Sequence, residues 1–245
     1  MKIFILTGAG ISAESGIKTF RDSVDGLWNN YRIEDVCSIE GFENDPNTVI
    51  NFHNQLQTDM NLKEPNDAHY AITEFMKDTN FEVTVVTQNI DCLHEKAGTT
   101  CLHMHGNINE QKCLDCGEVS YSKSEISDKS QCWMCKGNNL RPNVVWFGEM
   151  PYHMVHIEEK LKECDIFISV GTSGTVYPAA GFSKIAKNKR AYTINVNISK
   201  SHSWNFKEEI TGPASTALKK LLDKIKSGHY DEIVKERKKK KRAVS

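Results

Sequence analysis

Side chains suited to ligand binding and acid–base chemistry gather between residues 81 and 107. A β-branched apolar run ends in Gln88-Asn89-Ile90-Asp91, and His105-Gly106 follows after a short helical stretch. Such a run, bounded by polar residues, is typical of a buried strand. Amide and carboxyl groups would then lie at the strand's end. A histidine can titrate there near neutral pH, and a glycine beside it permits close backbone approach. Taken alone, the stretch fits a surface turn equally well.

Four cysteines have the spacing of a metal site. Cys113 and Cys116 form one C-x₂-C pair, Cys132 and Cys135 form another, and fifteen residues separate the pairs. This spacing predicts a tetrahedral Zn²⁺ site made of two knuckles. Four thiolates complete the coordination shell, so the zinc is expected to be structural. The remaining thiols show no such spacing and are expected in the core: Cys37, Cys92, Cys101 and Cys164.

A glycine-rich turn follows the first apolar run, at residues 2–6. Gly8-Ala9-Gly10-Ile11-Ser12-Ala13 fits the G-x-G-x-x-G/A pattern, in which backbone N–H groups at a helix start point at a pyrophosphate. A dehydrogenase would place an acid at the end of a second strand about 20 residues further on. Residues 20–28 read as a loop instead, which disfavours an ordinary dehydrogenase.

Two later apolar runs also end in polar or small residues. The run 165–170 precedes Gly171-Thr172-Ser173, the run 190–196 reaches Asn195-Val196-Asn197, and Gly212-Pro213-Ala214 opens a last helix. Ligands bind outside the carboxyl ends of parallel strands, so these ends together predict a dinucleotide site. The strand–helix alternation predicts an α/β fold: a doubly wound, parallel-sheet, Rossmann-like domain with a small inserted zinc-ribbon module and a helical layer.

The chain divides into a catalytic domain and a tail. The expected domain spans residues 1–232, with a Rossmann-like core at about 1–28, 79–108 and 144–226, a helical module at about 29–78 and a zinc module at about 109–143. Residues 233–245 form a basic tail that is expected to be solvated and disordered.

Composition limits the partners. The net charge of −1 argues against a general nucleic-acid or membrane surface, and no apolar run reaches membrane-spanning length. The chain starts directly with a strand, and its eight cysteines suit metal binding or reduced thiols, so a cytoplasmic protein, expected to be a monomer, is predicted.

Taken together, these motifs resemble the sirtuin family of NAD-dependent protein-lysine deacylases, and the short bacterial deacylase-type members most of all. The resemblance runs from about residue 2 to about residue 225. It rests on Gly8-Ala9-Gly10-Ile11-Ser12, Thr19-Phe20-Arg21, Thr87-Gln88-Asn89-Ile90-Asp91, His105-Gly106, the four cysteines, Val145-Trp146-Phe147-Gly148 and Gly171-Thr172-Ser173.

The resemblance implies a role for each motif. His105 would be the general base, and Val145 to Gly148 would pair with the backbone of an acyl-lysine protein or peptide. NAD⁺ would be the co-substrate and one structural Zn²⁺ the metal. The products would be free lysine, nicotinamide and O-acyl-ADP-ribose. NAD⁺ would be bound by Gly8, Ala9, Gly10, Ile11, Ser12, Phe20, Arg21, Gln88, Asn89, Ile90, Asp91, Gly171, Thr172, Ser173, Asn195, Val196, Asn197 and Ala214.

The chain departs from the family pattern in the acyl pocket. Members that prefer succinyl or malonyl lysine carry a Tyr and, three residues later, an Arg, where this chain has His53 and Leu56. Leu56 cannot pair with a carboxylate, although His53 could still donate one hydrogen bond. Acetyl or another uncharged acyl group is therefore the expected substrate.

The sequence is compatible with several alternatives. The segment Val145 to Gly148 could be a peptide-pairing edge or a plain core strand. The same pocket could serve NAD⁺ cleavage or ADP-ribosyl transfer with little deacylation. A zinc-ribbon binding module with an NAD-sensing pocket is a further alternative, although a sensor needs no base such as His105.

Overall fold

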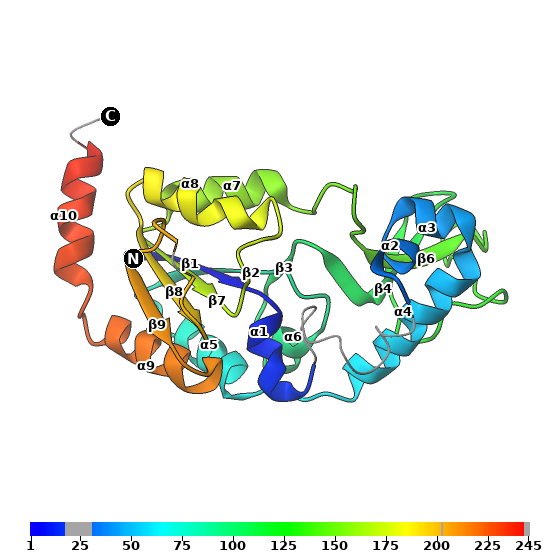
Figure 1. The fold of residues 1–245 in the computed structure, drawn as a ribbon, viewed down its shortest axis with the longest axis horizontal. Helices are drawn as coiled ribbons and strands as arrows, with labels where there is room; N and C mark the ends of the chain where they lie inside the picture. Colours follow the sequence, from blue (N-terminus) through cyan, green and yellow to red (C-terminus); the bar gives the residue numbers. More distant parts are fainter. Residues whose placement is uncertain (18–30, 202, 243–245) are drawn as a thin grey trace.

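The computed structural model describes residues 1–17, 31–201 and 203–242. Its larger part is a six-stranded sheet in the order β3-β2-β1-β7-β8-β9, with all neighbouring strands parallel (Figure 1). The order reverses between β1 and β7, which is where open parallel sheets bind ligands. The strands are β1 (Lys2–Thr7), β2 (Glu82–Thr87), β3 (Leu102–His103), β7 (Ile166–Val170), β8 (Tyr192–Asn197) and β9 (Glu208–Thr211).

Helices cover both faces of this sheet. In Figure 1, α7 (Met154–Glu163) and α8 (Phe182–Asn188) lie above it, and α5 (Asp67–Met76) and α9 (Ala214–Lys226) lie below it. The side chains of strand β1 show that both faces of the sheet are buried. Ile3 and Ile5 pack with α5 and α9, whereas the alternate residues Phe4 and Leu6 pack with α7 and α8. The predicted doubly wound α/β fold is confirmed.

Helix α5 packs with the sheet. Its buried residues Ala68, Ile72 and Phe75 share one apolar cluster with Leu218 and Leu221 of α9. The sequence had grouped this stretch with the helical module at about 29–78. In the structure, only the helices before residue 62 pack away from the sheet.

A second, smaller body combines those helices with an antiparallel sheet in the order β5-β4-β6 (right in Figure 1). Val49, Phe52 and Leu56 on one face of α4 pack against Ile108 of β4 and Trp146, so the helical layer and the inserted sheet share one core. The elements of this body are α2 (Ile33–Val36), α3 (Ile39–Asn44), α4 (Pro46–Asn61), β4 (Gly106–Cys113), β5 (Val119–Tyr121) and β6 (Leu140–Val144).

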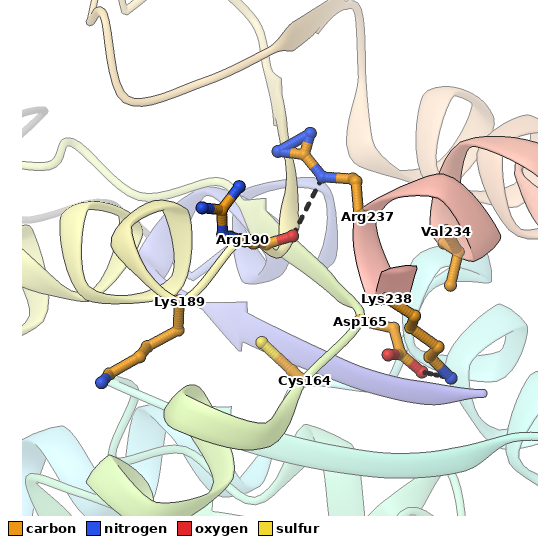
Figure 2. Close-up of a pocket in the computed structure, with 7 residues that line it drawn as sticks. All are labelled: Cys164, Asp165, Lys189, Arg190, Val234, Arg237 and Lys238. Atoms are coloured by element: carbon orange, nitrogen blue, oxygen red, sulfur yellow. Dashed lines mark hydrogen bonds and ion pairs between the residues drawn. The ribbon is translucent and has the colours of Figure 1, made fainter. Parts of the chain in front are cut away.

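The basic C-terminal segment is helical, which corrects the expectation that residues 233–245 are disordered. Helix α10 spans Asp231–Arg242, so α9 is not the last helix. Val234 is buried in the sheet's core, Arg237 donates from Nε and Nη2 to the backbone oxygens of Arg190 (2.9 Å) and Ala191 (3.0 Å), and Lys238 pairs with Asp165 at 2.8 Å. Figure 2 shows the small cavity that Val234, Arg237 and Lys238 line together with Asp165 and Arg190. The basic composition of the segment gave no sign of these contacts, because Val234, Arg237 and Lys238 come together on one face only when the segment is helical. Residues 243–245 lie outside the described part.

No helix within the described ranges is both long enough and apolar enough to cross a bilayer.

Candidate active site

The ends of four neighbouring strands meet at one edge of the large sheet. Thr7 at the end of β1 is the register partner of Thr87 on β2 and of Val170 on β7, and Val170 is in turn the partner of Val196 on β8. The chain therefore leaves these strands at one level, and the polar segments that follow them in sequence lie side by side.

Two glycine turns touch at the point where the strand order reverses. The Gly10 N–H donates to the Gly171 oxygen at 2.8 Å, and the Gly8 N–H donates to the Val170 oxygen at 3.0 Å. A Cβ on Gly10 would lie 2.7 Å from the Gly171 Cα, and a Cβ on Gly171 would lie 2.5 Å from the Ile11 nitrogen. Side chains are therefore excluded here by the close backbone approach. The helix that follows, α1 (Ala9–Ser12), is a single turn, and its Ile11 side chain packs into the core.

Polar side chains tie these turns to the segment after β2. Gln88 Nε2 donates to Thr172 Oγ1 at 3.0 Å, and Asn89 Nδ2 donates to Ser12 Oγ at 3.1 Å and to the Gly8 oxygen at 3.3 Å. Ser12 Oγ donates in turn to Asp91 Oδ2 at 2.9 Å. These bonds fix the relative positions of three loops that could contact one ligand.

Asp91 is enclosed by protein, with 2% of its surface exposed. Burial raises the pKa of its carboxyl, while the hydrogen bonds from the Leu93 N–H and from Ser12 oppose that shift. Because one oxygen accepts from each donor, the carboxyl anchors the loop that follows Ile90.

His105 has the arrangement of a general base. Its Nδ1 lies 2.9 Å from the backbone oxygen of Gln88, so Nδ1 must carry the proton and Nε2 presents a lone pair. Burial lowers the pKa of the imidazole, and the hydrogen bond to Gln88 opposes that shift only in part. The ring is therefore neutral at pH 7 and able to accept a proton.

His103, two residues earlier, has different chemistry. Its Nδ1 donates to the Asn89 oxygen at 2.9 Å and its Nε2 donates to Glu95 Oε1 at 3.0 Å. Burial acts to lower its pKa, but the hydrogen bond and charge of Glu95 outweigh burial and raise the pKa. With both nitrogens donating, His103 cannot serve as a base.

The predicted NAD⁺-binding residues after β7, on β8 and at the start of α9 separate into two groups. Thr172 and Asn197 lie together at the strand ends, where Asn197 Nδ2 donates to the Thr172 oxygen at 2.9 Å, and Ser173 is exposed beside them. The side chains of three others are buried, so a cofactor could reach only their backbone: Asn195, Val196 and Ala214. The remaining predicted residues Phe20 and Arg21 lie outside the described part.

The segment Val145 to Gly148 is not a core strand, because β6 ends at Val144. The Val145 N–H donates to the His105 oxygen at 2.9 Å, and the Phe147 N–H donates to the Cys37 oxygen at 2.9 Å. Trp146 is buried, whereas Phe147 is 56% exposed. The segment thus runs from the side of His105 to the surface.

The acyl-pocket candidates His53 and Leu56 lie on α4, beside Trp146. His53 Nδ1 donates to the Val49 oxygen at 2.9 Å, and His53 Nε2 accepts from Trp146 Nε1 at 3.4 Å. The expectation that His53 could donate to an acyl carboxylate is wrong, because both ring nitrogens are occupied. Burial also lowers its pKa to about 4, so the ring is uncharged.

Arg141, whose guanidinium lies over the Trp146 ring, is also engaged. Arg141 makes a two-pronged ion pair with Glu149, at 2.7 and 3.0 Å, and its guanidinium carbon lies 3.4 Å from the centroid of the Trp146 ring. Glu149 in turn accepts from the Trp146 N–H at 2.8 Å. This ion pair could not be predicted from the sequence, because nothing near a single Arg or Glu indicates such a partner.

The four predicted metal ligands form one cluster. Cys113 Sγ lies 3.6 Å from Cys135 Sγ, Cys116 Sγ lies 3.7 Å from Cys132 Sγ, and all four sulfurs lie within 4.8 Å of one another. Tetrahedral Zn–S bonds of about 2.3 Å require sulfurs about 3.8 Å apart. The cluster therefore fits one structural zinc ion, which would tie the end of β4 to the loop before β6.

Comparison with known proteins gives consistent matches. A model of the Sir2 family matches residues 8–178. An NAD-dependent protein deacylase of Vibrio cholerae is 44% identical over 228 residues, which cover 91% of this chain and 92% of the relative. A Sir2 homologue solved with NAD superposes with a TM-score of 0.83 at 32% identity, covering 93% of this chain and 90% of the other. A Sir2 protein bound to a myristoylated histone peptide gives a TM-score of 0.70 at 33% identity, covering 94% and 93%.

Proposed function

The chain belongs to the Sir2 family, and we propose that the strand-end residues described above carry out its reaction, with His105 as the general base. The enzyme is an NAD-dependent protein deacylase. It removes acyl groups from protein lysine and forms nicotinamide and O-acyl-ADP-ribose. Bound NAD⁺ supplies an electrophilic ribose carbon and nicotinamide as the leaving group.

The observation that carries the assignment of His105 is the bond from its Nδ1 to the Gln88 oxygen. This bond fixes the tautomer and aims Nε2 away from the segment after β2. A neutral Nε2 accepts the proton of a ribose hydroxyl, and the resulting oxygen can attack the acyl carbon. Bound NAD⁺ would supply the ribose carbon that the acyl oxygen attacks, with nicotinamide as the leaving group, and His105 would accept the proton of the ribose hydroxyl.

The residues after β2 would orient the ribose. Gln88, Asn89 and Asp91 are held by Thr172 and Ser12, so the walls of the pocket are positioned before a ligand binds. Preorganised polar groups lower the cost of ordering a bound substrate. Gly8 and Gly10 would let the phosphates approach the backbone, and Thr172 and Asn197 would lie at the adenosine half.

The peptide substrate would lie along Val145 to Gly148. A relative of this chain binds a myristoylated histone peptide, and this segment leads from the side of His105 to the exposed Phe147. An extended peptide placed here could pair with the backbone and present its acyl-lysine to the pocket.

The acyl group would be uncharged. His53 and Leu56 offer no cation and no free donor, and each nitrogen of the Arg141 guanidinium already donates to Glu149 or to a backbone oxygen. A buried carboxylate without a partner is costly. Wild-type enzyme should therefore remove acetyl or a longer apolar acyl group faster than succinyl, measured by mass spectrometry on matched peptides.

A double variant tests this pocket directly. His53→Tyr with Leu56→Arg should raise activity on succinyl-lysine by roughly tenfold or more, because a hydrogen bond to a charged group contributes about 1.5–3 kcal/mol. Wild-type enzyme that already prefers succinyl-lysine would contradict the proposal.

The setting of the enzyme is also proposed. We expect a monomer that works in the cytoplasm on protein substrates without nucleic acid, and the net charge of −1 supports the absence of a general polyanion surface.

Two histidine variants test the mechanism. His105→Ala should lower turnover by about 10²–10⁴, the usual contribution of a positioned base, while the fold and NAD⁺ binding stay close to wild type. The matched control His103→Ala should lower turnover far less, because that ring donates from both nitrogens. Near-normal turnover by His105→Ala on an acyl peptide would refute the assignment. A collapse only in His103→Ala would exchange the two roles.

A further inference from the structure

A second group of metal-ligand side chains lies at the β3 edge of the large sheet, apart from the four cysteines. Cys101 Sγ lies 3.1 Å and His103 Nε2 lies 3.0 Å from the same atom, Glu95 Oε1, and the ligand atoms of all three residues lie within 4.8 Å of one another. We propose that Glu95, Cys101 and His103 bind a second divalent metal ion, of the kind that prefers thiolate and imidazole ligands as Zn²⁺ does. This ion would exchange with metal ions in solution.

The local chain geometry builds this group. Cys101 and His103 flank Leu102 in extended backbone, so their side chains point to the same face. Glu95 lies on the preceding short helix α6 (Leu93–Lys96). Gly98, with φ +92°, ends that helix and turns the chain back toward β3.

A backbone contact orients the histidine. The Nδ1–H of His103 donates to the Asn89 oxygen at 2.9 Å, which directs Nε2 at the carboxylate. Metal-binding histidines are held in this way by a carbonyl or carboxylate on the other ring nitrogen. This contact is independent of Glu95 and Cys101, and it leaves Nε2 as the ligand atom.

The distances and exposure suit an open site. Zn–O, Zn–N and Zn–S bonds of about 2.0–2.3 Å place tetrahedral ligand atoms about 3.3–3.6 Å apart. The present separations of 3.0 and 3.1 Å to Oε1 need to grow by only about 0.5 Å. The Glu95 side chain is 40% exposed, so an ion can enter from solvent and water can complete the shell.

Charge and protons balance when the ion binds. Two hydrogens now point at Glu95 Oε1, one from the His103 Nε2–H and one from the Cys101 S–H. A divalent ion would replace both: the N–H and S–H bonds break, both protons go to solvent, and bonds from the metal to Nε2, Sγ and Oε1 form. The net charge of the cluster is unchanged. A thiolate–imidazole–carboxylate set selects zinc-like ions over Mg²⁺ and Ca²⁺, which prefer oxygen ligands alone.

Cobalt provides a direct probe of this site. Full-length protein loaded with one Zn²⁺ at the four cysteines is titrated with Co²⁺ under reducing, chelator-free conditions. Absorption records thiolate-to-cobalt charge transfer, and elemental analysis after gel filtration counts both metals. We expect one Co²⁺ to bind in addition to one retained Zn²⁺.

Three variants locate the ion. Cys101→Ser should abolish the charge-transfer band, and His103→Gln should weaken Co²⁺ binding by at least about tenfold. Cys37→Ser, which removes a thiol outside the cluster, should bind Co²⁺ as wild type does. A wild-type protein that holds no metal beyond one ion per chain would overturn the proposal, and so would a Cys101→Ser variant that keeps the band.

Discussion

Gly106→Ala is the substitution for which the structure gives the sharpest expectation. Gly106 follows the proposed base His105, opens β4, and has a φ of +81°. A Cβ at this position would lie 2.0 Å from the Asn143 oxygen and 3.0 Å from the Val144 Cα. Both neighbours are backbone of β6, so no side chain can rotate to relieve the overlap.

The expected destabilisation has two parts. An L-residue in left-handed backbone costs about 1–2 kcal/mol. The contact with the Asn143 oxygen must also lengthen by at least 1.0 Å to reach the 3.0 Å that real Cβ contacts keep. That movement breaks the pairing of Gly106 with Val144 and the bond from the Val145 N–H to the His105 oxygen, at about 1 kcal/mol for each lost hydrogen bond. The total is about 3–4 kcal/mol.

Gly16→Ala is the matched control. Gly16 has the same φ of +81°, but a Cβ there would meet none of the described residues within 4 Å, so only the left-handed backbone is penalised. The lost freedom of the unfolded chain is common to both variants and cancels. With about 2–4 °C of Tm per kcal/mol for a chain of this size, Gly16→Ala should lower Tm by about 2–8 °C and Gly106→Ala by about 6–16 °C.

Scanning calorimetry on zinc-loaded protein measures both variants, and deacylation of one acyl peptide measures the effect of Gly106→Ala on the neighbouring base. A shift of about 1 Å at a reacting group can cost about 10²-fold, so turnover of the folded Gly106→Ala variant should fall by that order. Equal Tm values for the two alanine variants, or wild-type turnover by Gly106→Ala, would refute the reasoning from backbone overlap.

Three further predictions concern the ionisation of the base, the zinc and the cofactor pocket. Because burial lowers the pKa of His105 below its usual 6.5, the ring stays neutral at pH 7, and kcat/KM should fall only as pH drops through that lowered value; an acidic limb centred at or above pH 6.5 would contradict this. Cys113→Ala removes one of four ligands, so zinc content and Tm should both drop, and well-folded wild-type protein without zinc would contradict the structural role. Asn89→Ala loses the bonds to Ser12 and Gly8, so turnover should fall strongly while the circular dichroism spectrum is kept; a wild type that shows no NAD⁺ binding by calorimetry would remove the basis of that prediction.

Patterns that repeat along the chain predicted the large sheet and the zinc cluster. The continuous apolar run of β1 was sufficient, because a parallel strand buried on both faces sends alternate residues into two cores. The spacing of the four cysteines was equally informative, since two C-x₂-C knuckles need only meet once to close a tetrahedron.

Partners far apart in sequence could not be predicted. His53 receives its hydrogen bond from Trp146, 93 residues away, and nothing near His53 signals that contact. Helix α10 was not predicted, for a related reason. Its lysines suggested a solvated segment, whereas Arg237 and Lys238 bind the backbone of Arg190 and the side chain of Asp165. Composition describes a segment alone, but the fold decides which of its charges find a partner.

His103 and His105 are anchored in the same way but differ in the partner of Nε2, and this one contact distinguishes an ion-pair partner from a general base. His103 and His105 both donate Nδ1–H to a backbone oxygen of the segment after β2, at 2.9 Å in each case, so both rings are held with Nε2 directed outward. The difference lies in what Nε2 meets. Glu95 accepts a hydrogen bond from the Nε2 of His103 and raises the pKa of that ring, whereas burial lowers the pKa of His105 and leaves its Nε2 with a lone pair. One carboxylate on the short helix α6 therefore determines which of two similarly anchored rings can accept a proton.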